Sequence, residues 1–98
     1  MRFRFKKKKL EELYTSEKGV QKYPVEVIDA FFEAMAVITA AKDERDLYAL
    51  KGFHFEKLSG DRKGQNSLRL NKQFRLIASF EKDAKGKLVL IVDIEDYH

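Results

Sequence analysis

The sequence has no cysteine, a single proline and only two histidines among its 98 residues. Without cysteine the chain can form neither a disulfide framework nor a thiolate metal site, and we expect a reducing, cytoplasmic location. No His-x-x-x-His spacing occurs, so neither a metal nor another cofactor is predicted. Apolar runs such as residues 88–92 are too short to cross a membrane, and the basic N-terminus lacks the apolar stretch of a secretory signal. We expect one soluble domain over residues 1–98.

Basic residues are concentrated in two parts of a chain whose net charge is +4. Residues 1–10 hold six basic side chains and no acidic one, and residues 51–80 hold seven basic against two acidic. Two such blocks are typical of a surface that binds a polyanion. Small cationic domains are also often basic for solubility alone, so charge by itself leaves a nucleic-acid partner open.

The first half of the chain has the spacing of helices. Residues 2–5 alternate Arg and Phe, as in a short half-buried strand, and residues 6–14 place apolar side chains three and four apart, as in an amphipathic helix. From Pro24, which suits the first turn of a helix, apolar side chains follow helical spacing to Ile38. Residues 43–49 predict one further helical turn.

The second half has the alternation of β-strands. Turn residues separate four runs that predict an antiparallel meander, at residues 53–58, 66–70, 74–80 and 87–94. In the last run, strict alternation places Leu90, Val92 and Ile94 on one face. The order of elements predicts an α+β fold, with a short N-terminal strand and two helices packed on one face of a mainly antiparallel sheet of four to five strands. The opposite face is predicted to be open and cationic.

The side chains that could carry chemistry suit one reaction, the cleavage of RNA without a metal. The 2′-hydroxyl must lose a proton to attack the adjacent phosphorus, charge develops on the phosphate, and the 5′-oxygen leaving group needs a proton. Arg75 is of the type that holds a phosphate bidentately, and His98 can give or take a proton near neutrality. Asp96 can orient that imidazole or act as the base. A C-terminal histidine is equally compatible with a frayed chain end, and Arg69 or Arg75 with a solvated sheet face.

Four stretches of the sequence carry a resemblance to a known family: residues 60–65 (Gly-Asp-Arg-Lys-Gly-Gln), 67–71 (Ser-Leu-Arg-Leu-Asn), 73–76 (Gln-Phe-Arg-Leu) and 95–98 (Glu-Asp-Tyr-His). Together they resemble the HigB-type toxins of the RelE/ParE superfamily, which belong to bacterial type II toxin–antitoxin systems. The resemblance extends over nearly the whole chain. It implies a RelE-like fold, ribosome-dependent endonuclease activity on mRNA, and a HigA-type antitoxin with a helix-turn-helix. The ribosome, mRNA and that antitoxin are then the expected partners, with DNA reached only through the antitoxin.

The resemblance also implies roles for individual residues. Arg75 resembles the phosphate-contacting arginine of the family, and Asp96, Tyr97 and His98 resemble its C-terminal catalytic cluster. Tyr97 is expected to stack on a base or orient the scissile phosphate, although a tyrosine there can also simply cap the edge of the core. The basic blocks are expected to bind RNA through Arg62, Lys63, Arg69, Lys6, Lys7, Lys8 and Lys9.

One region departs from the family pattern. Many HigB-type toxins have His-Pro-Leu-Lys before the Gly-Asp turn, whereas residues 56–59 of this chain are Glu-Lys-Leu-Ser, so His54 and Lys57 each stand two residues early. An offset of two keeps a side chain on the same face of a strand. Both residues are therefore predicted to reach the catalytic site, with Lys57 the preferred one. The shifted pair is also compatible with weaker or altered activity, and His54 with an ordinary strand histidine.

Two other functions remain open from the sequence. One is a toxin of the same fold that inhibits DNA gyrase by binding and cuts nothing. The other is a degenerate homologue that retains only the ability to bind an antitoxin. Arg75 and the Asp-Tyr-His ending favour the nuclease, because a protein that only binds has no need of a proton-transfer group.

Overall fold

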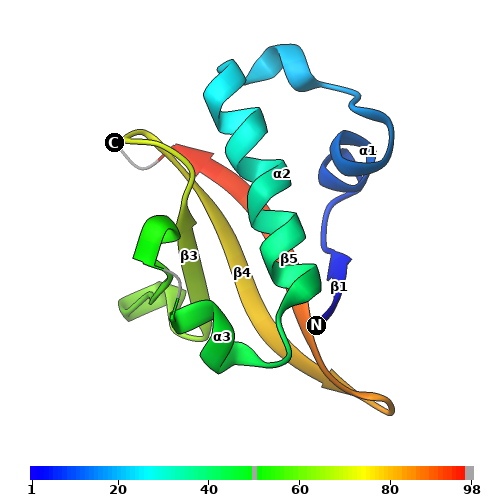
Figure 1. Cartoon of the computed structure of the whole chain (residues 1–98), viewed down its shortest axis with the longest axis vertical. Coiled ribbons are helices and arrows are strands. Elements are labelled where there is room, and N and C mark those ends of the chain that lie inside the picture. Colours follow the sequence, from blue (N-terminus) through cyan, green and yellow to red (C-terminus); the bar gives the residue numbers. More distant parts are fainter. Residues whose placement is uncertain (50, 97–98) are drawn as a thin grey trace.

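The computed structural model describes residues 1–49 and 51–96, which form an α+β structure (Figure 1). Its helices and strands are β1 (Arg2–Phe5), α1 (Lys8–Ser16), α2 (Val25–Ala40), α3 (Glu44–Tyr48), β2 (Glu56–Lys57), β3 (Gln65–Arg69), β4 (Phe74–Asp83) and β5 (Gly86–Asp96). Within the described residues the strands form one sheet in the order β1-β5-β4-β3-β2. Strand β1 runs parallel to β5, and the other neighbours are antiparallel. The predicted fold class is confirmed.

Helix α2 supplies the largest part of the helix layer, and Figure 1 shows it lying across one face of the sheet. Val27, Phe31, Met35 and Ile38 recur at helical spacing and are fully buried, because this stripe faces the sheet. Pro24 precedes the helix as its N-cap, one position earlier than the first turn where it was expected. No helix among the described residues is long and apolar enough to cross a membrane.

A β-bulge gives the open face of the sheet an apolar cluster of its own. The register between β4 and β5 shifts at Ile77 and Ala78, and Val92 is the extra residue on β5. Leu90 and Val92 pack with Ile77 on the open face, whereas Ile94 belongs to the main core beneath the helices. The prediction that Leu90, Val92 and Ile94 share one face was wrong, because alternation is broken by one residue at the bulge.

The segment before β3 is not the strand that was predicted over residues 53–58. Lys51–Phe53 form a single 3₁₀ turn, and His54 then has a φ of 47°, in the left-handed region that an extended strand does not use. Within this segment only Glu56–Lys57 form a strand, the short edge strand β2, which pairs with β3. Short edge strands of this kind limit unwanted pairing with other chains. His54 is therefore outside β2, and the rule that side chains two residues apart share a face of a strand does not apply to it.

Candidate functional site

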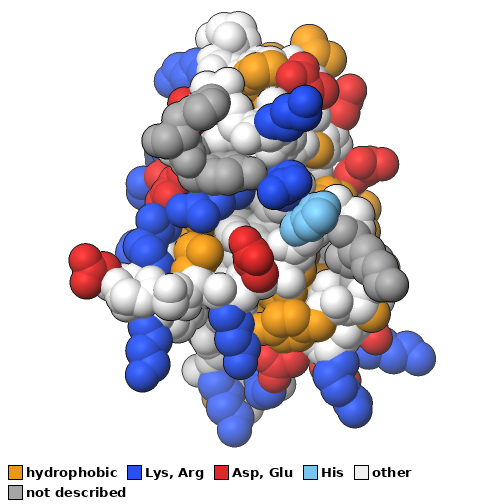
Figure 2. Space-filling model, turned by 90° about the vertical axis from the view of Figure 1, so that its left-hand side faces the viewer, with side chains coloured by type: hydrophobic (Ala, Val, Ile, Leu, Met, Phe, Trp, Pro, Cys, Tyr) orange, Lys and Arg blue, Asp and Glu red, His pale blue; other side chains and the backbone are white. Residues whose placement is uncertain are grey.

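A small hollow on the open face of the sheet collects polar side chains next to the β2 edge. It is lined by His54, Glu56, Ser67, Arg69 and Arg75. Glu56 is paired with Ser67 and Arg69 with Arg75 across the sheet, so the strand register places these four on one face. His54 reaches the hollow from the turn before β2. Figure 2 shows this side of the molecule, over which Lys and Arg side chains gather.

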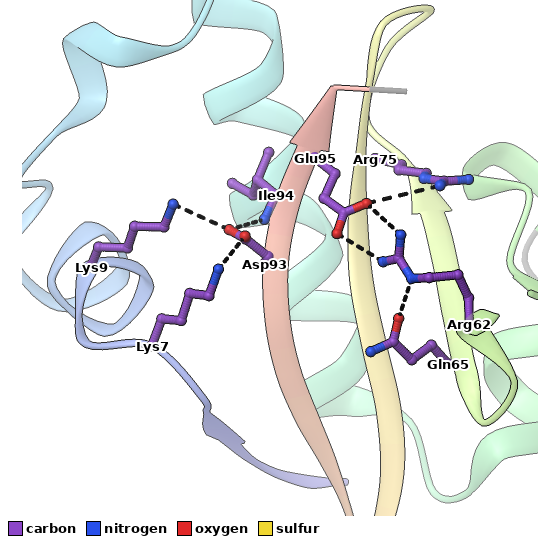
Figure 3. A network of polar contacts seen from close by, with 8 residues as sticks. All are labelled: Lys7, Lys9, Arg62, Gln65, Arg75, Asp93, Ile94 and Glu95. Carbon is purple, nitrogen blue, oxygen red and sulfur yellow. Dashed lines mark hydrogen bonds and ion pairs between the residues drawn. The ribbon is translucent and has the colours of Figure 1, made fainter. Parts of the chain in front are cut away.

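Beside the hollow, Glu95 connects Arg62 with Arg75 (Figure 3). Arg62 donates from Nη1 and Nη2 to the two carboxylate oxygens of Glu95 at 3.0 and 2.8 Å, and its Nε donates to Gln65 Oε1 at 2.7 Å. Glu95 stands directly opposite Arg75, whose Nη2 lies 3.9 Å from Glu95 Oε1. The hydrogen bonds from Arg62 to Glu95 raise the pKa of Arg62. Glu95 was not among the predicted site residues, because its role depends on the register of β5 against β4.

The side chain of Arg75 is well shielded from water for a surface cation. It is 22% exposed, against 35% for Arg62. Partial burial lowers the local dielectric constant, so a hydrogen bond from this guanidinium to an anion is stronger than it would be in open water. A shielded arginine beside the exposed Arg69 is an arrangement that can hold a phosphodiester.

The predicted C-terminal cluster is only partly within the described residues. Tyr97 and His98 lie outside them. Asp96 is the last residue of β5 and pairs with Phe74, whose ring packs in the helix layer, so the register places Asp96 on the helix-covered face. Its Oδ2 accepts a hydrogen bond from Gln73 Nε2 at 2.8 Å. The structure therefore does not bring Asp96 into the hollow on the open face.

Lys57 lies on the other side of the edge strand from the hollow. Its cross-strand partner Asn66 is on the helix-covered face, where the side-chain oxygen of Asn66 accepts a hydrogen bond from Tyr48 at 3.2 Å. Lys57 and Lys63 line a separate groove beside α3. His54 lines the hollow and Lys57 lines the groove, so the structure does not bring these two predicted site residues together. The two side chains are three residues apart, and side chains at that spacing on a strand point to opposite faces.

The N-terminal lysines predicted to bind RNA are exposed, and two of them contact Asp93 (Figure 3). The Nζ atoms of Lys7 and Lys9 lie 2.5 and 3.4 Å from the carboxylate oxygens of Asp93, whose side chain is 15% exposed. Burial disfavours the charged form of this carboxyl group. The hydrogen bonds from Lys7 and from a backbone amide, together with the charge of Lys9, outweigh burial and hold the pKa of Asp93 below its usual value. Lys6 and Lys8 are exposed as well.

Replacing Asp93 by asparagine should lower the free energy of unfolding at pH 7 by about 1–2 kcal/mol, because Lys7 and Lys9 lose a shielded anionic partner. The pKa of Asp93 is lower in the folded than in the unfolded state, so its ionisation stabilises the fold above the ordinary carboxyl pKa of about 4. That contribution is lost as the pH falls through the folded-state value. Urea unfolding should show the gap between the two proteins closing below about pH 4.

The exposed Asp29 on α2 provides a control for this measurement, since Asp29→Asn should change stability by less than about 0.5 kcal/mol. A gap between wild type and Asp93→Asn that is equally large at pH 7 and pH 3 would contradict the assignment.

No group of three or more His, Cys, Asp or Glu side chains that could hold a metal ion occurs within residues 1–49 and 51–96. The hollow brings together two guanidinium groups, which are cationic, with one imidazole and the carboxylate of Glu56, which can carry a proton. Chemistry at this site therefore depends on holding an anion and moving a proton.

Comparison with known proteins places the chain in a family. The model of a family described as "RelE-like toxin of type II toxin-antitoxin system HigB" matches residues 3–98. The toxin HigB-1 of Vibrio cholerae is 40% identical over 77 residues, which cover 79% of this chain and 81% of that protein.

The solved structures that share this fold include YoeB, ParE and YafQ proteins. A YoeB/ParE toxin from Agrobacterium tumefaciens aligns over 100% of both chains with a TM-score of 0.68 and 15% identity. A YafQ mutant from E. coli gives a TM-score of 0.67 at 10% identity, over 98% of this chain and 93% of that one. The YoeB–YefM complex from Staphylococcus aureus gives 0.61 at 21% identity, over 100% and 97%. At these identities the structural matches establish the shared fold.

Proposed function

The chain belongs to the HigB family of RelE-like toxins from type II toxin–antitoxin systems, and from this premise we propose that it is an endoribonuclease that cuts mRNA on the ribosome. The observation that carries the proposal is the hollow on the open sheet face. It combines a shielded arginine, an exposed arginine and an imidazole, which are the groups that phosphodiester cleavage by an internal hydroxyl requires.

In the proposed reaction the 2′-oxygen of the substrate attacks the adjacent phosphorus and loses its proton to a base. The bond from phosphorus to the 5′-oxygen breaks, and that oxygen takes up a proton, leaving a 2′,3′-cyclic phosphate and a free 5′-hydroxyl. Arg75 and Arg69 hold the phosphate and oppose the charge that develops on it. The nucleophile is supplied by the substrate, so the proposal needs neither a metal nor another cofactor.

Proton transfer has two candidate carriers in this proposal. His54 lines the hollow, which supports a direct role. His98, with Asp96 and Tyr97, is the second candidate because of the family resemblance. A base and an acid are both needed, so two imidazoles can divide the two steps between them.

We also propose the partners that the family implies. YoeB is a toxin solved in complex with YefM. We expect a corresponding antitoxin of the HigA type for this chain, with a helix-turn-helix that binds DNA, so that the toxin reaches DNA only through the antitoxin. The exposed cations on the open face and on α1 support binding to ribosomal RNA and mRNA in the cytoplasm. His54 and Arg75 in one hollow argue against a degenerate homologue and against a gyrase inhibitor, neither of which uses a phosphodiester site.

The test is cleavage of a defined mRNA on programmed ribosomes, with the new 5′ ends mapped. Wild type should produce ends inside the coding sequence, and none without ribosomes. Replacing the single ribose that supplies the attacking 2′-hydroxyl by deoxyribose should then lower the rate at least about 1,000-fold, because the nucleophile is gone. A deoxyribose two nucleotides away is the matched control and should cut at nearly the normal rate.

Cleavage that persists at the deoxy position would exclude attack by the 2′-hydroxyl. Growth arrest without new transcript ends, accompanied by DNA-damage signalling, would exclude the nuclease and favour inhibition of gyrase.

A further inference from the structure

A second recess lies on the other side of the edge strand from the hollow. It is a groove of about 570 Å³ between α3 and the turn at residues 60–64, and its walls include Tyr48, Lys57, Lys63 and Phe80. Figure 1 shows α3 close to the β3 edge of the sheet, away from α1 and β1. In Figure 2, hydrophobic side chains reach the surface between basic ones on this side of the molecule. The hollow and the groove have no lining residue in common.

Tyr48 is held in place as a partly exposed aromatic surface in this groove. Its side chain is among the few large apolar groups exposed in the described residues, at 39%. Its ring meets the ring of Phe55 edge-on, at 4.7 Å between centroids and 67° between planes, and its hydroxyl donates to the buried Asn66. Burial, and to a lesser degree the charge of Glu44, raise the pKa of Tyr48, so the phenol stays neutral at physiological pH. A ring fixed at one edge and at its hydroxyl loses little entropy when a flat group stacks on it.

The charges around the groove favour an anion. Lys57 and Lys63 are exposed at its wall. The acidic residue on the opposite wall, Glu44, accepts a hydrogen bond from Lys87 at 2.8 Å, which offsets its charge. A neutral aromatic platform beside two ammonium groups matches the two parts of a nucleotide, a base that stacks and a phosphate that pairs with cations.

We propose that this groove binds one nucleotide of single-stranded RNA adjacent to the scissile position, with its base on Tyr48 and its phosphate between Lys57 and Lys63. The proposal rests on the proposed function, because RNA is then the substrate. Neighbouring residues of β2 face opposite ways, Glu56 into the hollow and Lys57 into the groove, so an RNA strand that crosses this two-residue edge meets both sites. Lys57 is then a substrate-binding residue with no part in proton transfer.

The direct test is an NMR titration of the full chain with adenosine and uridine 5′-monophosphates. We expect shifts at the amides of Gly60 and Gly64, which line the groove. Tyr48→Leu should weaken this binding about 5-fold or more, whereas Tyr48→Phe keeps the ring and should stay within about 2-fold. Lys57→Ala should also weaken it, and Lys22→Ala, a matched loss of an exposed lysine outside the groove, should not.

Two comparisons separate this inference from the proposed nuclease. Arg75→Ala removes cleavage but should leave the titration at Gly60 and Gly64 unchanged. Tyr48→Leu should raise the KM for ribosome-bound mRNA and change the preferred cleavage sites, with kcat within about 2-fold. If wild type binds mononucleotides in the groove yet cuts nothing, the nuclease fails and the nucleotide site stands.

The inference is overturned if wild type cuts mRNA while neither mononucleotide shifts the groove amides. It is also overturned if Tyr48→Leu and Tyr48→Phe both keep the wild-type KM and cleavage sites, or if Tyr48→Leu impairs binding of the antitoxin and leaves RNA binding intact. The last result would assign the groove to a protein partner. The Tyr48→Phe variant, whose ring still packs on Phe55, guards against a result caused by misfolding.

Discussion

Replacing Arg75 by alanine should lower the rate of mRNA cleavage at least about 100-fold, the usual cost of removing one group that stabilises charge in a transition state. The side chain of Arg75 is only 22% exposed, whereas Arg69 beside it is exposed, so water replaces the guanidinium of Arg75 poorly. Arg75→Lys should recover only a small part of the rate, because an ammonium group cannot hold two phosphate oxygens in the geometry of a guanidinium. Single-turnover cleavage on programmed ribosomes measures both variants.

The matched control for this experiment is Arg4→Ala. Arg4 is also a strand arginine in an ion pair, with Glu81, but it lies on β1 at the far edge of the sheet. Its loss should change the rate less than about 2-fold. The fold of Arg75→Ala should persist, because Glu95 keeps its two hydrogen bonds from Arg62. A fully active, folded Arg75→Ala protein would remove the phosphate-binding role that we assign to Arg75.

Deleting residues 96–98 should abolish toxicity and leave a folded domain. Within the part of the chain that the structure describes, the deletion removes the last pair of β5, between Asp96 and Phe74, and the hydrogen bond from Gln73 to Asp96. The reaction loses His98 and its neighbours, and removal of a general acid or base typically costs about 100-fold to 10,000-fold. Growth after induction, together with a thermal melt of the purified chain, measures both effects.

His54→Gln is the informative companion to this deletion, because it removes the other imidazole without shortening the chain. If the two histidines divide the proton transfers, each variant should be strongly impaired and their pH–rate profiles should lose opposite limbs. Full toxicity of the shortened chain would exclude Asp96, Tyr97 and His98 from catalysis and leave His54 as the proton carrier.

The sequence predicted those parts of the fold that depend on local pattern. The helical spacing from Val27 to Ile38 and the alternating strands β3 and β4 hold in the structure, because each residue's neighbours along the chain decide which face is buried. The family was also recognised from local motifs, and the match over residues 3–98 confirms it. Arg75 was identified as a candidate phosphate-binding residue from one of these motifs, residues 73–76.

The errors lie where a single backbone conformation changes the pattern. The positive φ of His54 ends the strand that was predicted over residues 53–58. The extra residue Val92 reverses the side to which the following residues of β5 point, and neither feature leaves a mark in hydrophobic spacing. Lys57 lines the groove and not the hollow that His54 lines, because side chains three residues apart on a strand point to opposite faces. Glu95 was missed for a different reason, because only the alignment of β5 with β4 reveals that it faces Arg75.

The internal ion pairs have a consequence for the response to ionic strength. Among the side chains expected at RNA, Arg62 already neutralises Glu95, and Lys7 and Lys9 already neutralise Asp93. A phosphate that binds these cations exchanges one anion for another, so it adds little to the counterion release that makes nucleic-acid binding sensitive to salt. The logarithm of RNA affinity should accordingly fall with the logarithm of salt concentration less steeply than the number of cations suggests. The affinity of such a toxin for RNA would therefore change little when the ionic composition of the cell changes.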